Sequence, residues 1–241
     1  MKPFLYIDNW NRAQPRNRLE QLLEERAWPV ERIRAQSSAL PASLEYCGVF
    51  VGPSDSSAYD LDPWIVEERG TLRRLARSGV PVLGLCFGSQ MLGAALFGVD
   101  VVQRRRARES GFGEIVRAPA ATNDPLLANL PDRLDVFHWH GDEVVPGHPD
   151  MEVLAASAAC SNQIWRWRGG PAWGVQPHPE YDRAGLCAWF SQDEERFRAA
   201  GYDTGQAAAA AVDCGPAAAV FENFLAIVAA QAAAAAAGRR R

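Results

Sequence analysis

Cys86 lies in a Gly-Leu-Cys-Phe-Gly sequence at residues 84–88, directly after the apolar run at residues 80–83. This pattern predicts a short buried strand that ends in a sharp turn and continues as a helix, which is the geometry of a nucleophile elbow. Glycines flank the cysteine because the backbone is crowded at such a turn. The start of a helix also favours a thiolate, since that end carries partial positive charge. The pattern therefore indicates covalent chemistry by a cysteine nucleophile.

A histidine and a glutamate that suit this nucleophile follow a second short apolar segment at residues 172–176, in the sequence Pro-His-Pro-Glu. The imidazole of His178 can take the proton of a thiol and later give it to a leaving amine. The carboxylate of Glu180 can orient the ring through its second nitrogen. We therefore predict a catalytic triad of Cys86, His178 and Glu180.

The two motifs together resemble the class I (triad) glutamine amidotransferase domain, and among its members the stand-alone GMP-synthase-like type. Gln90 completes the family's Gly-x-Cys-x-Gly-x-Gln motif, and His178 and Glu180 match its His-x-Glu pair. Further segments similar to the family occur in the family's order at residues 4–9, 49–53, 109–114 and 139–142. Each match is short, but their shared order makes the set specific.

The resemblance implies a glutaminase mechanism. The Cys86 thiolate would attack the side-chain amide of glutamine, ammonia would leave, and water would hydrolyse the γ-glutamyl thioester. The backbone N–H groups of Gly52 and Phe87 would form the oxyanion hole. The glutamine pocket would be lined by Gln90, Trp139, Gly141 and Asp142. The ammonia would pass to an acceptor on a separate synthetase partner, and no cofactor is implied.

Two residues depart from the family pattern. Val51 replaces the first glycine of a Gly-Gly-Pro turn, which could alter the oxyanion site. Trp139 stands where many members have serine or asparagine, which could narrow the glutamine pocket. Both departures leave room for a different amide substrate.

Strand and helix patterns alternate from the N-terminus to the elbow and would position these residues. Strands are expected at residues 3–8, 47–51 and 81–85, and helices at residues 17–26, 63–78 and 87–97. Strand-like runs then dominate up to the second motif, at residues 99–103, 113–117, 134–138, 152–157, 163–168 and 172–176. The alternation predicts an α/β fold, a flavodoxin-like three-layer sandwich with a mainly parallel central sheet. Gly52, Cys86 and His178 each follow a strand, so they can converge at the carboxyl ends of the sheet.

The chain divides into two predicted parts. Residues 1–191 form the amidotransferase domain. Residues 192–241 comprise an insertion or lid segment and an alanine-rich C-terminal helix that packs on the same domain. An apolar face along residues 217–237 supports this packing.

The composition fits a globular protein without nucleic-acid or membrane partners. The 241 residues carry a net charge of −4, so no basic surplus favours nucleic acid. No stretch of eighteen apolar residues other than alanine favours a membrane span, and no long apolar run at the N-terminus indicates secretion. The five cysteines show no C-x-x-C spacing. A reduced, cytoplasmic setting is therefore predicted.

Other charged and metal-binding residue types add little to the predicted chemistry. Lys2 is the only lysine and no Walker motif occurs, so the chain carries no visible ATP site. His138 and His140 would share a face of a strand, but no third ligand at diagnostic spacing accompanies them, so we predict no metal. The basic run at residues 104–108 is typical of a solvated strand end, with a docking patch or an anionic acceptor site as the alternative.

Three other functions stay open. The first is a stand-alone hydrolase of γ-glutamyl amides that uses the same triad. The second is a cysteine enzyme of the α/β-hydrolase class, like dienelactone hydrolases, although Glu180 follows His178 here, against the usual order. The third is a non-catalytic binding module.

Overall fold

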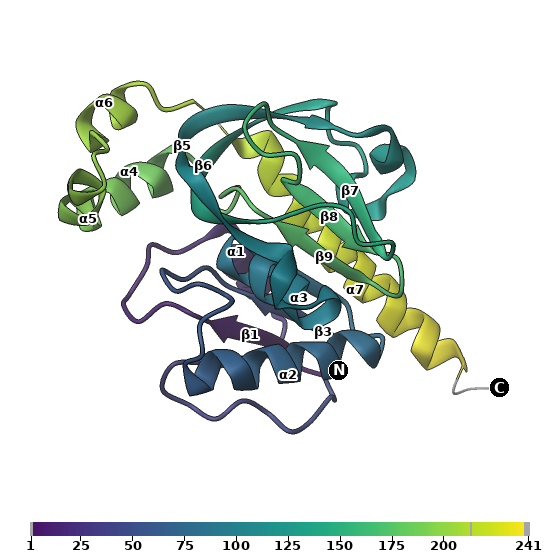
Figure 1. Ribbon diagram of the computed structural model, residues 1–241. Helices are drawn as coiled ribbons and strands as arrows, with labels where there is room; N and C mark the ends of the chain where they lie inside the picture. Colours follow the sequence, from purple (N-terminus) through teal and green to yellow (C-terminus); the bar gives the residue numbers. More distant parts are fainter. Residues whose placement is uncertain (1, 213, 239–241) are drawn as a thin grey trace.

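The computed structural model describes residues 2–212 and 214–238, which form one nine-stranded sheet flanked by helices (Figure 1). The strands are β1 (Phe4–Asp8), β2 (Val30–Arg34), β3 (Gly48–Val51), β4 (Val82–Leu85), β5 (Val102–Arg117), β6 (Arg133–Val144), β7 (Met151–Ala156), β8 (Ile164–Trp167) and β9 (Ala172–Val175). The α-helices are α1 (Arg18–Glu25), α2 (Pro63–Arg77), α3 (Phe87–Phe97), α4 (Arg183–Gln192), α5 (Glu194–Ala199), α6 (Thr204–Ala209) and α7 (Ala219–Gly238).

One half of the sheet is parallel and sits between two layers of helices. Strands β2, β1, β3, β4 and β9 lie side by side in this order, and all their pairings are parallel. Side chains alternate between the two faces of this half. Phe4 and Tyr6 pack into the core that α1 and α7 cover, whereas Leu5 and Ile7 pack into the core under α2 and α3. The parallel half is therefore the three-layer, flavodoxin-like part of the fold.

The other half of the sheet is antiparallel, so the fold is α/β with a mixed sheet, and the predicted mainly parallel sheet is not confirmed. From β9 outward the order is β8, β7, β5 and β6, and each neighbouring pair is antiparallel. No α-helix lies between residues 102 and 175 of the described chain. Parallel neighbours need a long crossover, usually a helix, so these short connections leave only antiparallel pairing.

Two strands differ from the expectations. The edge strand β2 was missed because its sequence, Val-Glu-Arg-Ile-Arg, is polar and mostly exposed. The structure has one long strand, β5, where separate strands at residues 99–103 and 113–117 were expected. The polar run in its middle carries no apolar alternation, and pairing with β6 holds it as a strand. Backbone pairing therefore decides both cases.

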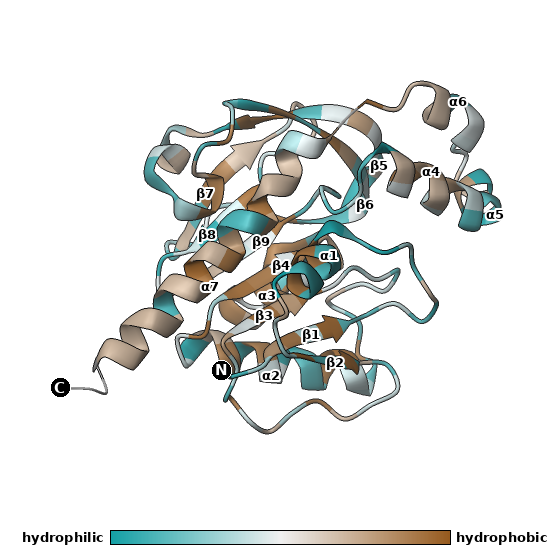
Figure 2. Cartoon of the chain, turned by 180° about the vertical axis from the view of Figure 1, so that it is seen from behind, coloured by the Kyte–Doolittle hydropathy of each residue, from teal (hydrophilic) through white to brown (hydrophobic). Residues whose placement is uncertain are grey.

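The helices from α4 to α7 cover two sides of the sheet. The helices α4, α5 and α6 group beside β5 and β6 (Figure 1), and α7 runs across the other face near β8 and β9 (Figure 2). The stretch Gly215–Ala237 is long and apolar enough to cross a membrane by length and composition alone. However, its residues Phe221, Phe224 and Val228 are buried in the core, as expected for a helix packed on a domain. The domain division and the cytoplasmic setting stay predictions, and residues 239–241 lie outside the described chain.

A buried carboxylate ties α2 to the strand ends that carry the site. Glu68 is fully buried, and its Oε1 accepts a 3.0 Å hydrogen bond from Asn9 Nδ2, which also donates to the Gly52 carbonyl at 3.2 Å. The other carboxylate oxygen has no partner among the described residues. Burial disfavours the charged form, and although the Asn9 hydrogen bond opposes this, the pKa of Glu68 rises to about 8.

Replacing Glu68 by glutamine should therefore stabilise the fold at alkaline pH. A carboxyl whose pKa is raised contributes its full stability below the unfolded pKa of 4.5, and this stability is lost as pH rises toward 8. We expect the free energy of unfolding of the variant to match that of wild type near pH 4 and to exceed it by up to about 5 kcal/mol at pH 9, since each pH unit between 4.5 and 8 contributes about 1.4 kcal/mol. Urea unfolding at both pH values measures this, with Glu67→Gln, an exposed neighbour, as the control. A variant less stable than wild type at pH 9 would show that Glu68 is ionised and paired.

Candidate active site

Cys86 sits between β4 and α3 in a backbone conformation that L-residues rarely adopt. Its φ is +51° and its ψ is −109°, and its N–H donates to the Val175 carbonyl at 2.7 Å. Strain of this kind persists only where the surroundings hold it, and it gathers at functional sites. Here it is held between two parallel strands and the helix that follows. The elbow thus presents the thiol at the carboxyl ends of β4 and β9.

The two flanking glycines are required by close backbone approaches. A Cβ on Gly84 would overlap the backbone of Gly88, and a Cβ on Gly88 would overlap the Val51 carbonyl oxygen. Both contacts are with backbone, which cannot move aside as a flexible side chain can. The spacing Gly-x-Cys-x-Gly therefore follows from the packing of the elbow against β3.

His178 and Glu180 form a buried pair just after β9. His178 Nδ1 lies 2.7 Å from Glu180 Oε1, both side chains are almost fully buried, and the His178 backbone N–H donates to the Phe137 carbonyl at 2.8 Å. Burial disfavours an imidazolium, but the neighbouring Glu180 carboxylate and Cys86 sulfur outweigh this effect and raise the pKa of His178 well above its ordinary value. The Nε2 atom has no hydrogen-bond partner among the described residues. It is therefore free to exchange a proton with the thiol.

A small cavity of about 70 Å³ opens above Cys86. Most of the predicted site residues line it: Cys86, Phe87, Gln90, Trp139, Gly141, Asp142 and His178. Glu180 lies behind His178 rather than on the wall. The Cys86 Sγ is 3.9 Å from the Trp139 carbonyl oxygen, a distance that allows a weak S–H hydrogen bond. The structure thus gathers the proposed nucleophile, base and substrate-binding residues around one opening.

Two of the predicted pocket residues have internal partners. Gln90 Nε2 donates to the Asp142 carbonyl at 3.0 Å and to Gln176 Oε1 at 3.2 Å, so its amide supports the pocket wall. The Asp142 carboxylate accepts a 2.6 Å hydrogen bond from Ser57 Oγ and faces Tyr59 at 3.3 Å. The carboxylate is therefore fixed in direction at the edge of the cavity.

Of the two backbone N–H groups predicted to form the oxyanion hole, one is available and the other is already hydrogen-bonded. Phe87 is the first residue of α3, so its N–H has no partner within the helix. The Gly52 N–H instead donates to the Ile7 carbonyl at 2.9 Å, in the sheet. The Val51 carbonyl of the same peptide faces the elbow at Gly88. In this conformation Gly52 cannot serve as a donor unless the Val51–Gly52 peptide turns over.

The helices after Glu180 contribute to the site, although no residue after Glu180 was among the predicted site residues. The Trp189 ring of α4 lies 5.0 Å from the His178 ring, and the Phe197 ring of α5 lies 4.4 Å from that of Trp139. Arg196 of α5 also lines the cavity. The alanine-rich composition around these helices gave no signal of this role.

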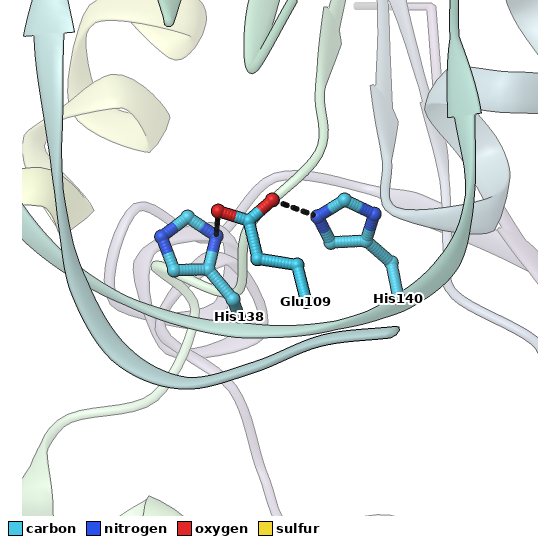
Figure 3. A group of neighbouring side chains, drawn as sticks. All are labelled: Glu109, His138 and His140. Atoms are coloured by element: carbon cyan, nitrogen blue, oxygen red, sulfur yellow. Dashed lines mark hydrogen bonds and ion pairs between the residues drawn. The ribbon is translucent and has the colours of Figure 1, made fainter. Parts of the chain in front are cut away.

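A glutamate and two histidines form a cluster beside the cavity (Figure 3). Glu109 Oε2 lies 3.0 Å from His140 Nε2, and Glu109 Oε1 lies 3.7 Å from His138 Nδ1. His140 Nδ1 faces the Asp142 carbonyl at 2.9 Å, so both ring nitrogens of His140 have polar neighbours. Burial disfavours the Glu109 carboxylate, but hydrogen bonds from His140 and Ser157 and the nearby imidazoles lower the pKa of Glu109 to about 2. These contacts therefore fix the ring of His140 and the carboxylate of Glu109 in place.

The same cluster is the one group among the described residues whose donor atoms could hold a metal ion, since they lie within 4.8 Å of one another. The sequence reasoning found no third ligand because Glu109 lies on β5, across the hairpin from the two histidines. Ser157 Oγ and Gln163 Nε2 bond the carboxylate at 2.7 and 2.9 Å, so protein donors already occupy it. His140 lines the cavity and the other two residues do not, so we assign Glu109 and His138 to the support of the cavity wall.

The family model and the named relatives that match this chain agree on one family. The family model for "Glutamine amidotransferase class-I" matches residues 7–184. A protein of Pyrococcus abyssi that is named as one subunit of a glutamine-hydrolyzing GMP synthase is 30% identical over 156 residues, covering 63% of this chain and 71% of that protein. The putative glutamine amidotransferase-like protein YfeJ of Salmonella typhimurium is 36% identical over 118 residues, covering 48% of this chain and 45% of that protein. The chain thus spans less than half the length of this second relative.

Solved structures share the fold over most of the chain. A glutamine amidotransferase from Thermotoga maritima has a TM-score of 0.79 at 22% identity, covering 94% of this chain and 97% of that one. A glutamine amidotransferase from Methylobacillus flagellatus has a TM-score of 0.70 at 25% identity, covering 81% of this chain and 77% of that one. The first match, at its low identity, supports the fold alone.

Proposed function

Because the chain belongs to the class I glutamine amidotransferase family, we propose that it is a glutaminase that supplies ammonia to an acceptor on a partner synthetase. The observation that carries the proposal is the convergence of Cys86 and His178 at one cavity, with Glu180 hydrogen-bonded behind His178 and the elbow backbone held at a positive φ. Relatives named as separate subunits of glutamine-hydrolyzing GMP synthases support both the glutamine substrate and a distinct synthetase partner.

The proposed reaction uses atoms already in place. His178 Nε2 takes the thiol proton, and Cys86 Sγ attacks the amide carbon of glutamine. The Phe87 N–H stabilises the resulting oxyanion; one such donor typically contributes on the order of 10²–10³ in rate. The imidazolium, held by Glu180, gives its proton to the departing ammonia. Water then attacks the γ-glutamyl thioester with His178 as base, and glutamate and the free thiol are restored.

A hydrolase of γ-glutamyl amides is the second candidate, since it would use the same triad without ammonia transfer. Trp139 lines the cavity and contacts Phe197 of α5, where the resemblance expects serine or asparagine in many family members. The family assignment replaces the α/β-hydrolase alternative. Turnover of glutamine against γ-glutamyl amides separates the two remaining enzymes, and no turnover of either would favour a binding module.

The orientation of the Gly52 peptide suggests how basal hydrolysis could be kept low. We propose that this peptide turns over when a partner binds, which exchanges the Gly52 N–H bond to Ile7 for a bond to the oxyanion. The side chain of Val51 is fully buried and restricts that peptide. The isolated chain would then waste little glutamine.

Replacing Val51 by glycine should raise basal ammonia release from glutamine by about tenfold, because glycine frees the peptide to supply a second oxyanion donor. Ammonia and glutamate are measured at saturating glutamine for the isolated wild type and variant. Val49→Gly is the matched control, since it removes an equally buried valine from the same strand without touching that peptide. Wild-type turnover of tens per second without a partner would contradict the gating. A strong preference for γ-glutamyl amides would replace the glutaminase by the hydrolase.

A further inference from the structure

The mouth of the cavity carries three arginines that the proposed chemistry does not use: Arg104, Arg108 and Arg196. Two of them have carboxylate partners. Arg104 lies 3.3 Å from the Asp142 carboxylate, and Arg196 pairs with Asp55. Arg108 has no carboxylate within ion-pair distance in residues 2–212 and 214–238. It is exposed, yet it lies on the wall above the nucleophile. A cation without a counter-ion at this position needs an explanation.

A break in the register of the β5–β6 pair places Arg108 there. Arg104 pairs with Asp142 and Glu109 pairs with His140, so four residues of β5 lie opposite Gly141 alone. Bulges of this kind re-aim a side chain and are frequent next to active sites. The bulge lays the Arg108 guanidinium over the Trp139 ring, with Cζ 4.6 Å from the ring centroid. Stacking on the indole holds the cation in one place.

A second guanidinium approaches the same indole. The Cζ of Arg196 lies 5.9 Å from the Trp139 ring centroid. Burial and the positive charges of Arg12 and Arg108 lower the pKa of Arg196, against the opposing effect of Asp55. Two like charges over one ring favour an anion between them, because a concave site with low-dielectric walls concentrates the field. The planar fork of arginine matches a carboxylate in particular.

We propose that Arg108, assisted by Arg196, binds the α-carboxylate of the γ-glutamyl substrate while the γ-amide lies at Cys86. The inference rests on the proposed function and names the group of its substrate that this site recognises. The α-carboxylate is present in glutamine and in γ-glutamyl amides alike, so the assignment holds for both candidate enzymes. Arg108 is thereby a specificity residue rather than a catalytic one.

The test is a thermodynamic cycle in which one protein side chain, Arg108, and one ligand group, the α-carboxylate, are changed separately and together. Calorimetric titration in a Cys86→Ala background, where no turnover occurs, compares L-glutamine with its neutral α-carboxamide. Arg108→Gln should weaken glutamine binding by about tenfold and leave carboxamide binding within about twofold, as expected for one charge-assisted hydrogen bond. Arg108→Lys should restore part of the loss. Arg106→Gln is the matched control, since Arg106 belongs to the same basic run but does not line the cavity.

The outcomes distinguish this inference from the proposed function. Unchanged glutamine binding in Arg108→Gln, or an equal loss for both ligands, would overturn the carboxylate site. Turnover of glutamine by the chain with Cys86 intact is measured separately. If the chain hydrolyses glutamine and the glutamine affinity is unchanged in Arg108→Gln, the carboxylate site is rejected and the glutaminase is retained. Absent hydrolysis combined with binding that depends on Arg108 rejects the glutaminase alone, and absence of any binding rejects both.

Discussion

Replacing Cys86 by alanine should reduce glutamine hydrolysis by at least about 10⁴-fold, because the loss of a nucleophile removes the covalent route altogether. Cys86 is the only cysteine on the cavity wall in the described chain, and the elbow holds it next to His178. Ammonia release at saturating glutamine measures the loss. Cys187→Ala is the matched control, since Cys187 is half-buried on α4 and lines no part of the cavity.

Covalent labelling tests the assignment of Cys86 as the nucleophile without relying on turnover. A diazo-ketone analogue of glutamine should modify Cys86 alone. Cys160 is a useful contrast, because burial raises the pKa of its thiol to about 12 and leaves it protonated at neutral pH. Peptide mapping locates the label. A label that persists unchanged in Cys86→Ala would remove the assignment of the nucleophile.

The parts of the site that the sequence could predict are those fixed by local backbone patterns. Cys86 follows β4 and His178 follows β9, and these two strands are parallel neighbours. Residues after the carboxyl ends of neighbouring parallel strands meet at one edge, so a strand-ending motif was enough to bring them together. The flanking glycines carried a further local signal, because the turn leaves no room for a Cβ.

The parts that could not be predicted depend on pairing between distant segments. Arg108 reaches the cavity through a bulge that only the β5–β6 register reveals. Arg196 arrives on a short helix held by aromatic packing around Trp189 and Phe197. The direction of the Gly52 N–H is set by its hydrogen bond to Ile7, which no sequence motif encodes. Register, packing and peptide orientation thus lie beyond what residue spacing can show.

Replacing His178 by alanine should reduce glutamine hydrolysis about as much as the loss of Cys86 does, whereas Glu180→Gln should leave a measurable remainder. The imidazole transfers every proton in the proposed reaction, while Glu180 only orients and stabilises it through the 2.7 Å contact with Nδ1. Groups that act as a unit are not additive, so the double variant should be little worse than His178→Ala alone. If the fold-loss in hydrolysis of the double variant equalled the product of the two single-variant losses, His178 and Glu180 would not belong to one triad.

The pH profile separates this role of Glu180 from a merely structural one. The carboxylate helps to raise the pKa of His178, so the imidazolium that accompanies the thiolate persists to alkaline pH in wild type. A group with a raised pKa keeps its proton below that pKa and loses it as pH rises through it. Glu180→Gln removes the negative charge, lowers the pKa of His178 and should move the alkaline limb of kcat/KM toward neutral pH. A variant that loses activity with an unshifted alkaline limb would show that Glu180 only supports the fold around His178.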